Sequence, residues 1–281
     1  MLAVALTLIG ACSTLRFGYY QADELVFWWL DGYLDFNEAQ TPRVRQALTQ
    51  WHAWHRRTQL PDYAVLLARA RSEAVDSTSP ERVCRWWKDV RGRIDVALEH
   101  AILDAAQVVL TLTAEQMRHV ERRYAKNNEE FRSDYLQTDP AQRRKESIQR
   151  AVERAESFYG RLDEVQRDRV AKLVAESPFD ADLWFGERKQ RQQEALQMLR
   201  RLRVDGAGVD QAQAALRAYY ERTVRSPRLE YQRYADSLTQ YNCEFAASLH
   251  NNASASQRAV LIGKLKGWEN DARSLAGDVA P

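Results

Sequence analysis

The sequence predicts an all-α protein, a multi-helix bundle of antiparallel neighbours arranged in one body or in two helical lobes. Helix breakers are scarce, with 11 Gly and 7 Pro in 281 residues, and the helix-forming residues Ala, Leu, Arg, Glu and Gln dominate. Apolar residues recur at intervals of three and four along most of the chain. No segment shows the alternation of apolar and polar residues that is typical of a half-buried strand.

In the first half of the chain, this periodicity places helices over residues 22–34, 42–57, 61–75 and 80–110. The last of these is opened by Ser79-Pro80, a cap followed by proline at the first helical position. Each helix is expected to bury one apolar stripe. The stripes are Val26, Trp29, Leu30 and Tyr33; Val44, Leu48, Trp51 and His55; Tyr63, Leu66 and Leu67; and Val83, Trp86 or Trp87, Val90, Ile94 and Leu98.

In the second half, capping residues mark the helix starts as well. Thr113 begins a helix that continues to Tyr135, and Asp139-Pro140 begins one that ends at Tyr159. Asp163 begins a shorter helix, and further helices are expected over residues 181–202, 211–224, 227–250 and 254–277. The charged tract 187–203 is interpreted as a solvated helix face.

One short motif recurs at four helix starts. Thr113 and Gln116 belong to an LTxxQ sequence, and variants of it pair Asp163 with Gln166, Ser254 with Gln257, and Asn37 with Gln40. Each is a capping box, in which the first side chain accepts from a first-turn N–H and the Gln accepts from the N–H of the cap residue. At the Asn37 variant, Thr41 before Pro42 competes as the cap. The motif predicts well-capped helices, with or without a further functional meaning.

The N-terminus indicates export. Residues 1–11, MLAVALTLIGA, are apolar and uncharged, which is typical of a secretory signal and too short to span a bilayer. Ile9-Gly10-Ala11-Cys12 resembles a lipobox, so we expect cleavage before a lipidated Cys12, with residues 12–20 as acylated cysteine and short tether. The alternative is a buried N-terminal element with a chance cysteine. Residues 21–281 would form a periplasmic domain with a candidate lobe boundary near 137–140, and Ser13 resembles sequences passed to the outer membrane.

Charge and motifs narrow the function classes. The 41 Lys and Arg residues are balanced by 39 Asp and Glu, which does not favour a nucleic-acid partner. No sequence typical of hydrolases, nucleotide-binding enzymes or zinc proteases occurs, so we predict no enzymatic activity and no cofactor. His52 and His55 share a helix face as metal ligands sometimes do, but no further ligand follows at a suitable spacing. We therefore expect packing histidines and no metal.

Two further sets of residues have open interpretations. If Cys12 carries lipid, Cys84 and Cys243 remain in an oxidising compartment, which predicts a disulfide between them; two separately buried thiols are the alternative. Trp28, Trp29, Trp51 and Trp54 fit either the core or the level of the lipid headgroups. Their positions on helical stripes favour the core.

Several segments together resemble the uncharacterised bacterial lipoproteins grouped as domain of unknown function 6279. They are the lipobox, Trp51 to Tyr63, Leu112 to Gln116, Tyr124 to Leu136 and the segment from Tyr241 to Arg273. This resemblance implies an envelope location and supplies no activity. The LTxxQ sequence also resembles the Spy/CpxP group of periplasmic chaperones, which implies a cradle for unfolded polypeptides.

Two functions of different classes follow for a protein attached to the membrane by its lipid. The first is chaperone-like binding of non-native polypeptides in the periplasm. The second is a structural or adaptor role, in which the lipoprotein docks one fixed envelope protein. An exposed apolar groove or concave face would favour the first function. A compact apolar patch with a polar rim would favour the second.

Overall fold

The computed structural model describes residues 14–277, and this part of the chain is helical with no strand. Its helices are α1 Thr14–Tyr20, α2 Ala22–Leu34, α3 Thr41–Thr58, α4 Leu60–Glu73, α5 Pro80–Val109, α6 Ala114–Tyr135, α7 Pro140–Tyr159, α8 Glu164–Glu176, α9 Ala181–Val204, α10 Val209–Val224, α11 Leu229–Asn251 and α12 Ala255–Gly277. The predicted all-α class is confirmed. The predicted helix boundaries from residue 22 onward agree within two residues, because caps and prolines fix them locally.

Two N-terminal predictions have different outcomes. Cys12 and Ser13, the predicted lipidation site and its neighbour, lie outside the described residues, as does the signal sequence 1–11. Residues 14–20, expected as part of a tether, form helix α1. No helix within residues 14–277 combines the length and the apolar character needed to cross a bilayer.

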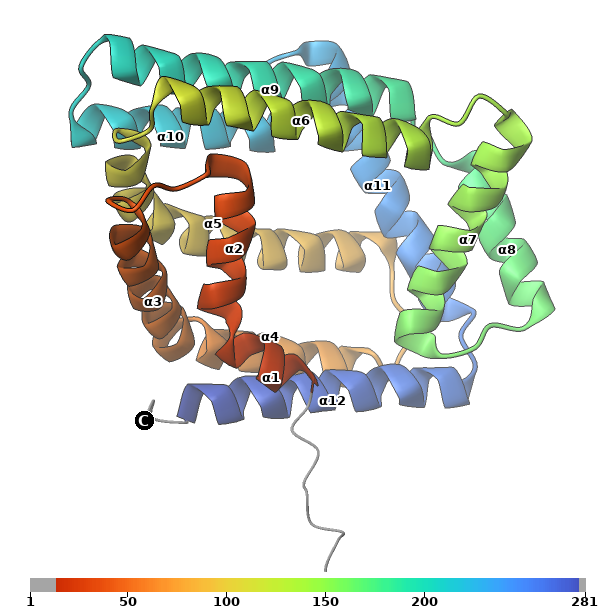
Figure 1. Cartoon of the computed structure of the whole chain (residues 1–281). Helices are drawn as coiled ribbons and strands as arrows, with labels where there is room; N and C mark the ends of the chain where they lie inside the picture. The colour runs from red at the N-terminus through yellow and green to blue at the C-terminus, as the bar shows by residue number, and fades with distance from the viewer. Residues whose placement is uncertain (1–13, 278–281) are drawn as a thin grey trace, which may run out of the picture.

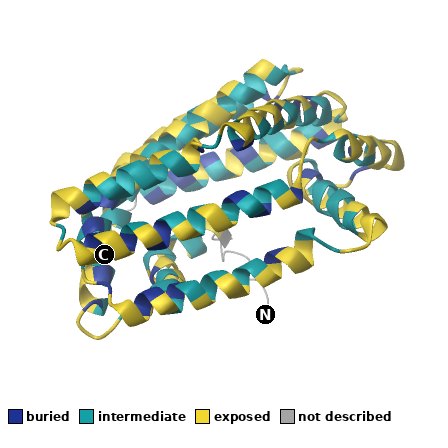
Figure 2. Cartoon of the chain, turned by 90° about the horizontal axis from the view of Figure 1, so that it is seen from above, coloured by how far each residue is buried: buried dark blue, intermediate teal, exposed yellow. Residues whose placement is uncertain are grey.

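The helices are arranged as a frame (Figure 1). Helices α6, α9 and α10 form the upper side and α4 with α12 the lower side, while α2 with α3 and α7 with α8 close the two ends. Helices α5 and α11 cross behind the frame and pack against each other. Figure 2 shows buried residues as short separate segments along the helices rather than as one continuous core.

The buried apolar residues accordingly form separate small clusters. One joins α5, α9 and α10 through Ala106, Leu202 and Ala212. Another lies where α6 begins, around Leu112, Met117 and Leu199. A third joins α7, α8 and α11 around Ala155, Leu162 and Val170. The first two lie at the upper left of the frame and the third at its right-hand end, so each junction has its own packing.

Two predicted buried faces are wrong. On α2 the buried residue is Phe27, whereas Val26 and Trp29 are exposed, and Trp28 is exposed as well. On α5, Trp86 packs beneath Arg69 of α4, but Trp87, Val90, Ile94 and Leu98 are exposed. Helical periodicity identifies an apolar face, but it does not determine whether another helix covers that face.

Trp51 and Trp54, predicted for the core, are half-buried and pack between helices. The Trp51 Nε1 donates to the backbone carbonyl of Ala97 at 3.0 Å. The Trp54 ring stacks on His100 with centroids 3.7 Å apart. Both contacts join α3 to α5 and close the left-hand end of the frame.

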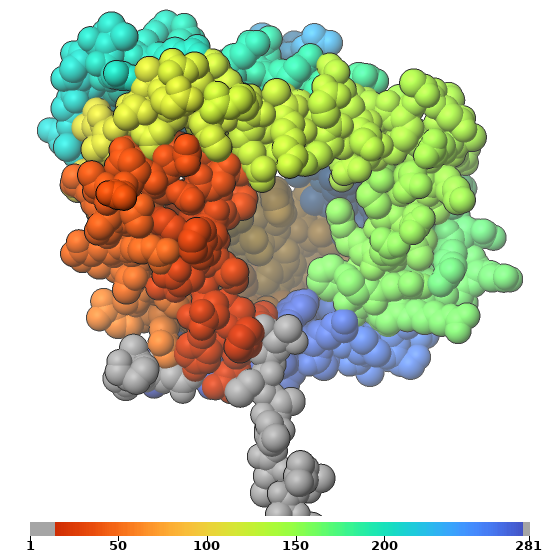
Figure 3. Space-filling view, in the orientation of Figure 1, coloured from red at the N-terminus to blue at the C-terminus, as the bar shows by residue number. Residues whose placement is uncertain are grey.

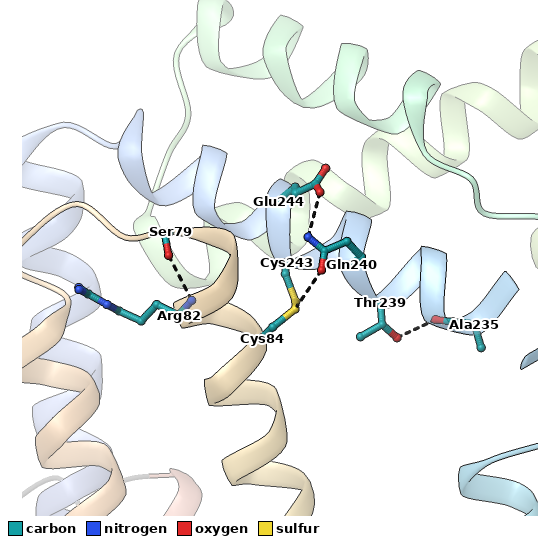
Figure 4. The surroundings of a disulfide bond; sticks show 8 residues. All are labelled: Ser79, Arg82, Cys84, Ala235, Thr239, Gln240, Cys243 and Glu244. Carbon is teal, nitrogen blue, oxygen red and sulfur yellow. Dashed lines mark hydrogen bonds between the residues drawn. A yellow bond between two sulfur atoms is a disulfide. The ribbon is translucent and has the colours of Figure 1, made fainter. Parts of the chain in front are cut away.

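The predicted disulfide is present and links the two helices behind the frame (Figure 4). Cys84 of α5 and Cys243 of α11 are bonded, with their Cα atoms 5.5 Å apart. Cys243 is buried. The bond closes a loop across 159 residues, so it connects segments that are remote in sequence.

Candidate functional site

The four capping motifs meet in two pairs. The first pair brings Gln40, before α3, against Gln116 in the first turn of α6, 76 residues away. The second brings Gln166 in α8 against Gln257 in α12, 91 residues away. We call these the first and the second glutamine pair. Motifs that the sequence presented as four separate helix caps therefore form two contacts between distant parts of the chain.

In the first pair, each amide uses its full hydrogen-bonding capacity. Gln116 Oε1 accepts from the backbone N–H of Thr113 at 2.9 Å, and its Nε2 donates to Gln40 Oε1 at 2.7 Å and to the Asp35 carbonyl at 2.9 Å. Gln40 repeats this pattern, since its Nε2 donates to Gln116 Oε1 at 3.2 Å and to the Thr111 carbonyl at 3.0 Å. Both glutamines are buried, where a polar group without a partner would be destabilising.

The second pair has the same pattern. Gln166 and Gln257 each donate to the other's Oε1 at 2.8 Å. Gln166 also donates to the carbonyl of Asn252, and Gln257 to that of Arg161. In all four cases the accepting carbonyl belongs to the residue two positions before the partner's cap. This shared geometry shows that the two junctions are built alike.

The predicted cap residues occupy the expected positions. Thr113, Asp163 and Ser254 each accept from the N–H of their own Gln, at 3.2, 2.8 and 3.2 Å. At the fourth motif, Asn37 forms the box with Gln40. The competing cap Thr41 lies inside the helix, where its hydroxyl donates to the carbonyl of Asn37.

Each glutamine pair joins two helical hairpins at their turns. The first joins the α2–α3 turn to the α5–α6 turn, and the second joins the α7–α8 turn to the α11–α12 turn. In Figure 1 these junctions lie at the upper left and lower right of the frame. They hold the frame in shape, and we assign them a structural role.

The frame surrounds a hollow, which is the candidate functional site (Figure 3). Its walls are α2, α6, α7 and α12 with α1, and its floor is formed by α5 and α11. The chain exposes 17452 Å², whereas a compact protein of 32.5 kDa exposes about 12,000 Å². Even if the seventeen residues outside the described range contributed their full unfolded surface of about 2,700 Å², the remainder would exceed that value.

Helix α5 has two covered faces that lie opposite each other. One meets α3 and α4, and the carbonyl of Ala97 accepts from Trp51 there. The other meets α11 and α10, through the Cys84–Cys243 bond and the packing of Ala106. In Figure 1, α5 runs from right to left with α4 below it and α10 above its left-hand end, while α11 descends past its right-hand end.

The right-handed turn of α5 then determines which residues face the hollow. Residues at intervals of three and four from Trp87 lie between the two covered faces, and from the right-handed course of α5 we infer that this side of the helix faces the hollow. We call them the floor stripe, and they are between 39% and 50% exposed: Trp87, Val90, Ile94 and Leu98. The opposite open face, which points away from the hollow, is mixed and includes Arg85, Gly92, Val96, Glu99 and Leu103.

A wall of the hollow continues the apolar surface. Helix α2 packs on α3 through Phe27, against whose ring the Arg45 guanidinium lies at 3.9 Å. The hollow lies on the side of α2 that faces away from α3 (Figure 3). Leu25 and Trp29 lie opposite Phe27 on the helix and are exposed. The floor and this wall therefore present apolar and aromatic side chains to the same space.

A buried carboxylate, that of Glu187, connects α9 to Arg228 at the start of α11. Glu187 of α9 is 4% exposed, so the expectation of a solvated face over residues 187–203 is wrong there, because α6 and α10 both pack on α9. Arg228 holds both oxygens of Glu187, at 2.6 and 2.7 Å, and Arg191 donates at 2.9 Å. Burial alone would raise the pKa of Glu187, but these hydrogen bonds and one from Ser226 hold it below its ordinary value.

His55 lies in an aromatic cluster that joins α1, α3 and α4. Its Nδ1 lies 2.9 Å from the hydroxyl of Tyr19 and its Nε2 lies 3.2 Å from that of Tyr63. The ring of His52 packs on Tyr19 with centroids 4.6 Å apart. Burial and the neighbouring His52 lower the pKa of His55 to about 4. Both histidines therefore have packing roles, and residues 14–277 contain no group of three acidic, His or Cys side chains placed to hold a metal.

The comparisons with known proteins identify a family without supplying an activity. A model of a family of unknown function (DUF6279) matches residues 32–222. This range contains the first glutamine pair and the floor stripe, but it ends before Gln257 and Cys243. No curated protein and no solved structure matches the chain.

Proposed function

The chain belongs to the DUF6279 family, and we propose that it is a membrane-anchored periplasmic lipoprotein whose hollow binds non-native polypeptides. The floor stripe carries this proposal. Its apolar side chains remain exposed between the two covered faces of α5, and they lie in a concave surface. Collapsed or extended polypeptides expose apolar segments that such a surface can cover.

The chemistry of the floor suits partners without one fixed shape. Burying apolar area gives about 25 cal/mol per Å² and requires no particular geometry. The floor stripe contains no charged side chain, and its only polar side-chain group is the indole N–H of Trp87. The LTxxQ resemblance to periplasmic chaperones favours the same function.

Export and lipidation are supported by separate observations. The lipobox-like run ending at Cys12 predicts acylation, and the Cys84–Cys243 bond fits an oxidising compartment. Cys12→Ala should leave an unprocessed precursor without acyl mass, measured by mass spectrometry of the protein purified from cells. Acylation in spite of this substitution, or a wild-type protein without acyl mass, would contradict the lipoprotein assignment.

The client-binding proposal is tested by light scattering of a reduced, aggregating model protein in the presence of the mature domain. We expect suppression near stoichiometric ratio. Replacing two floor residues, Ile94→Gln with Leu98→Gln, should weaken it about tenfold, because two apolar side chains leave the binding surface. The matched control is Val96→Gln with Leu103→Gln, which changes two similarly exposed residues on the opposite face of the same helix.

Two results would reject the proposal. One is the absence of suppression at several-fold excess of the protein. The other is equal loss of suppression in the floor and control variants. Recovery of a single envelope partner by cross-linking in intact cells, together with no suppression, would instead support the adaptor function.

A further inference from the structure

We propose that helix α1 lies on the surface of the membrane that holds the lipid of Cys12, so that the folded body docks directly on the bilayer. This inference rests on the proposed lipidation. It adds a second membrane contact, which is made by the protein surface itself. The partner is a lipid bilayer, contacted at the level of its headgroups.

The first argument is the distance between the lipid and the folded body. Only one residue, Ser13, separates Cys12 from Thr14, where α1 begins, so the two are two residues apart along the chain. Because one residue spans at most about 3.6 Å, the start of α1 lies within about 7 Å of the Cα atom of Cys12. An acylated Cys12 lies at the membrane surface, so α1 must lie there too.

The second argument is that α1 is fixed to the body. The Tyr19 hydroxyl lies 2.9 Å from Nδ1 of His55, and the ring of Tyr19 packs on that of His52. Helix α1 also contacts α12 and α2. Because these contacts hold α1 against the frame, it does not serve as a spacer that lets the body move away from the membrane.

The third argument is the chemistry of the face that α1 leaves uncovered. Phe17 lies almost opposite Tyr19 on the helix and is 67% exposed. Tyr20 lies beside Phe17 on the helix and is exposed as well, and the Arg56 guanidinium of α3 lies 5.6 Å from its ring centroid. Leu15 is also exposed, but on the side of α1 that carries Tyr19. Aromatic residues with apolar neighbours are the types enriched at the headgroup level of membranes. Phe17 thus points away from the contacts that Tyr19 makes with the body, one turn after the start of α1.

The test uses the full lipidated chain in intact cells, with a photo-reactive residue at one position. Phe17→benzoylphenylalanine should give a phospholipid adduct on irradiation, detected by mass spectrometry. The matched control is Phe179→benzoylphenylalanine, at an exposed phenylalanine in the loop between α8 and α9. We expect the lipid adduct at position 17 to exceed that at position 179 at least tenfold.

The outcomes separate this inference from the lipoprotein proposal. Acylated protein with equal or no lipid adducts at the two positions would overturn membrane docking and leave lipidation intact. A protein without acyl mass would overturn lipidation itself. A second variant, Phe17→Ser in the acylated protein, should lower the adduct yield of Tyr20→benzoylphenylalanine several-fold with an unchanged melting temperature. An unchanged adduct yield would also overturn docking.

Discussion

Replacing Gln116 with alanine should destabilise the protein far more than the loss of an ordinary helix cap. Its side chain takes part in four hydrogen bonds, with Thr113 N–H, the Asp35 carbonyl and both polar atoms of Gln40. At about 1 kcal/mol net for each bond, the expected loss is about 4 kcal/mol. The buried Gln40 amide also loses one partner at each of its polar atoms.

The control for this prediction is Gln211, which accepts from the N–H of Gly208 at 2.9 Å in a single exposed turn. Gln211→Ala should cost about 1 kcal/mol or less. The assay is urea unfolding of the oxidised mature domain, comparing free energies of unfolding by linear extrapolation. A double-mutant cycle of Gln40→Ala with Gln116→Ala should give a coupling of at least about 1 kcal/mol. Equal losses for Gln116→Ala and Gln211→Ala, or additive effects in the cycle, would refute the pairing argument.

Three further predictions concern the disulfide, an aromatic cluster and a buried charge. Reduction of the Cys84–Cys243 bond, which spans 159 residues, should lower the free energy of unfolding by about 5 kcal/mol by the chain-entropy model; an unchanged urea midpoint in reductant would contradict this. The pKa of His55 is lowered from 6.5 to about 4 in the folded state, so the unfolded chain binds more protons between these values and the unfolding free energy should fall as pH drops from 6.5 toward 4; a His55→Phe variant with the same pH dependence would disprove it. Glu187→Gln should lower the unfolding free energy by about 3 kcal/mol, because Arg228 and Arg191 lose their buried counter-charge; a melting temperature within 1 °C of the wild type would count against it, since about 3 kcal/mol corresponds to several degrees.

The helices and their ends were predictable because their causes are local. Ser79 accepts from the N–H of Arg82 with Pro80 at the first helical position, so four residues of sequence determine where α5 begins. The boxes at Thr113 and Asp163 are equally local, since each cap and its Gln are three residues apart. The family was also predictable, from segments spread over the chain.

The pairing of the glutamines was not predictable from these signals. A capping box explains the acceptor atom of Gln116, the Oε1 that receives the N–H of Thr113, but it assigns no partner to Nε2. Nε2 has no acceptor within the motif itself. Its partner Gln40 lies 76 residues away, and a single contact at that separation produces no repeating pattern in the sequence. The unmet donor was the one feature of the motif that pointed beyond the helix start.

The exposure of the floor stripe on α5 was not predicted either, although its sequence pattern is clear. The spacing of Trp87, Val90, Ile94 and Leu98 is that of a buried face, and a sequence reading gives every such face a covering helix. In the structure, α3 and α4 cover one side of α5. Helices α10 and α11 cover the opposite side, and no helix covers the floor stripe. The direction of an apolar face can be derived from sequence, whereas its covering depends on the arrangement of distant helices.

An open frame with an apolar floor needs interactions that prevent collapse onto that floor. Hydrophobic burial is not directional and would favour closing the hollow over the stripe. The contacts at the junctions of the frame are directional instead: the two glutamine pairs, the Cys84–Cys243 bond and the Arg228–Glu187 ion pair each require one relative placement of their helices. Because these contacts join segments that are remote in sequence, they hold the walls and the floor in defined positions. The floor stripe then remains exposed in the folded protein, so the proposed binding of a polypeptide would require no prior opening step.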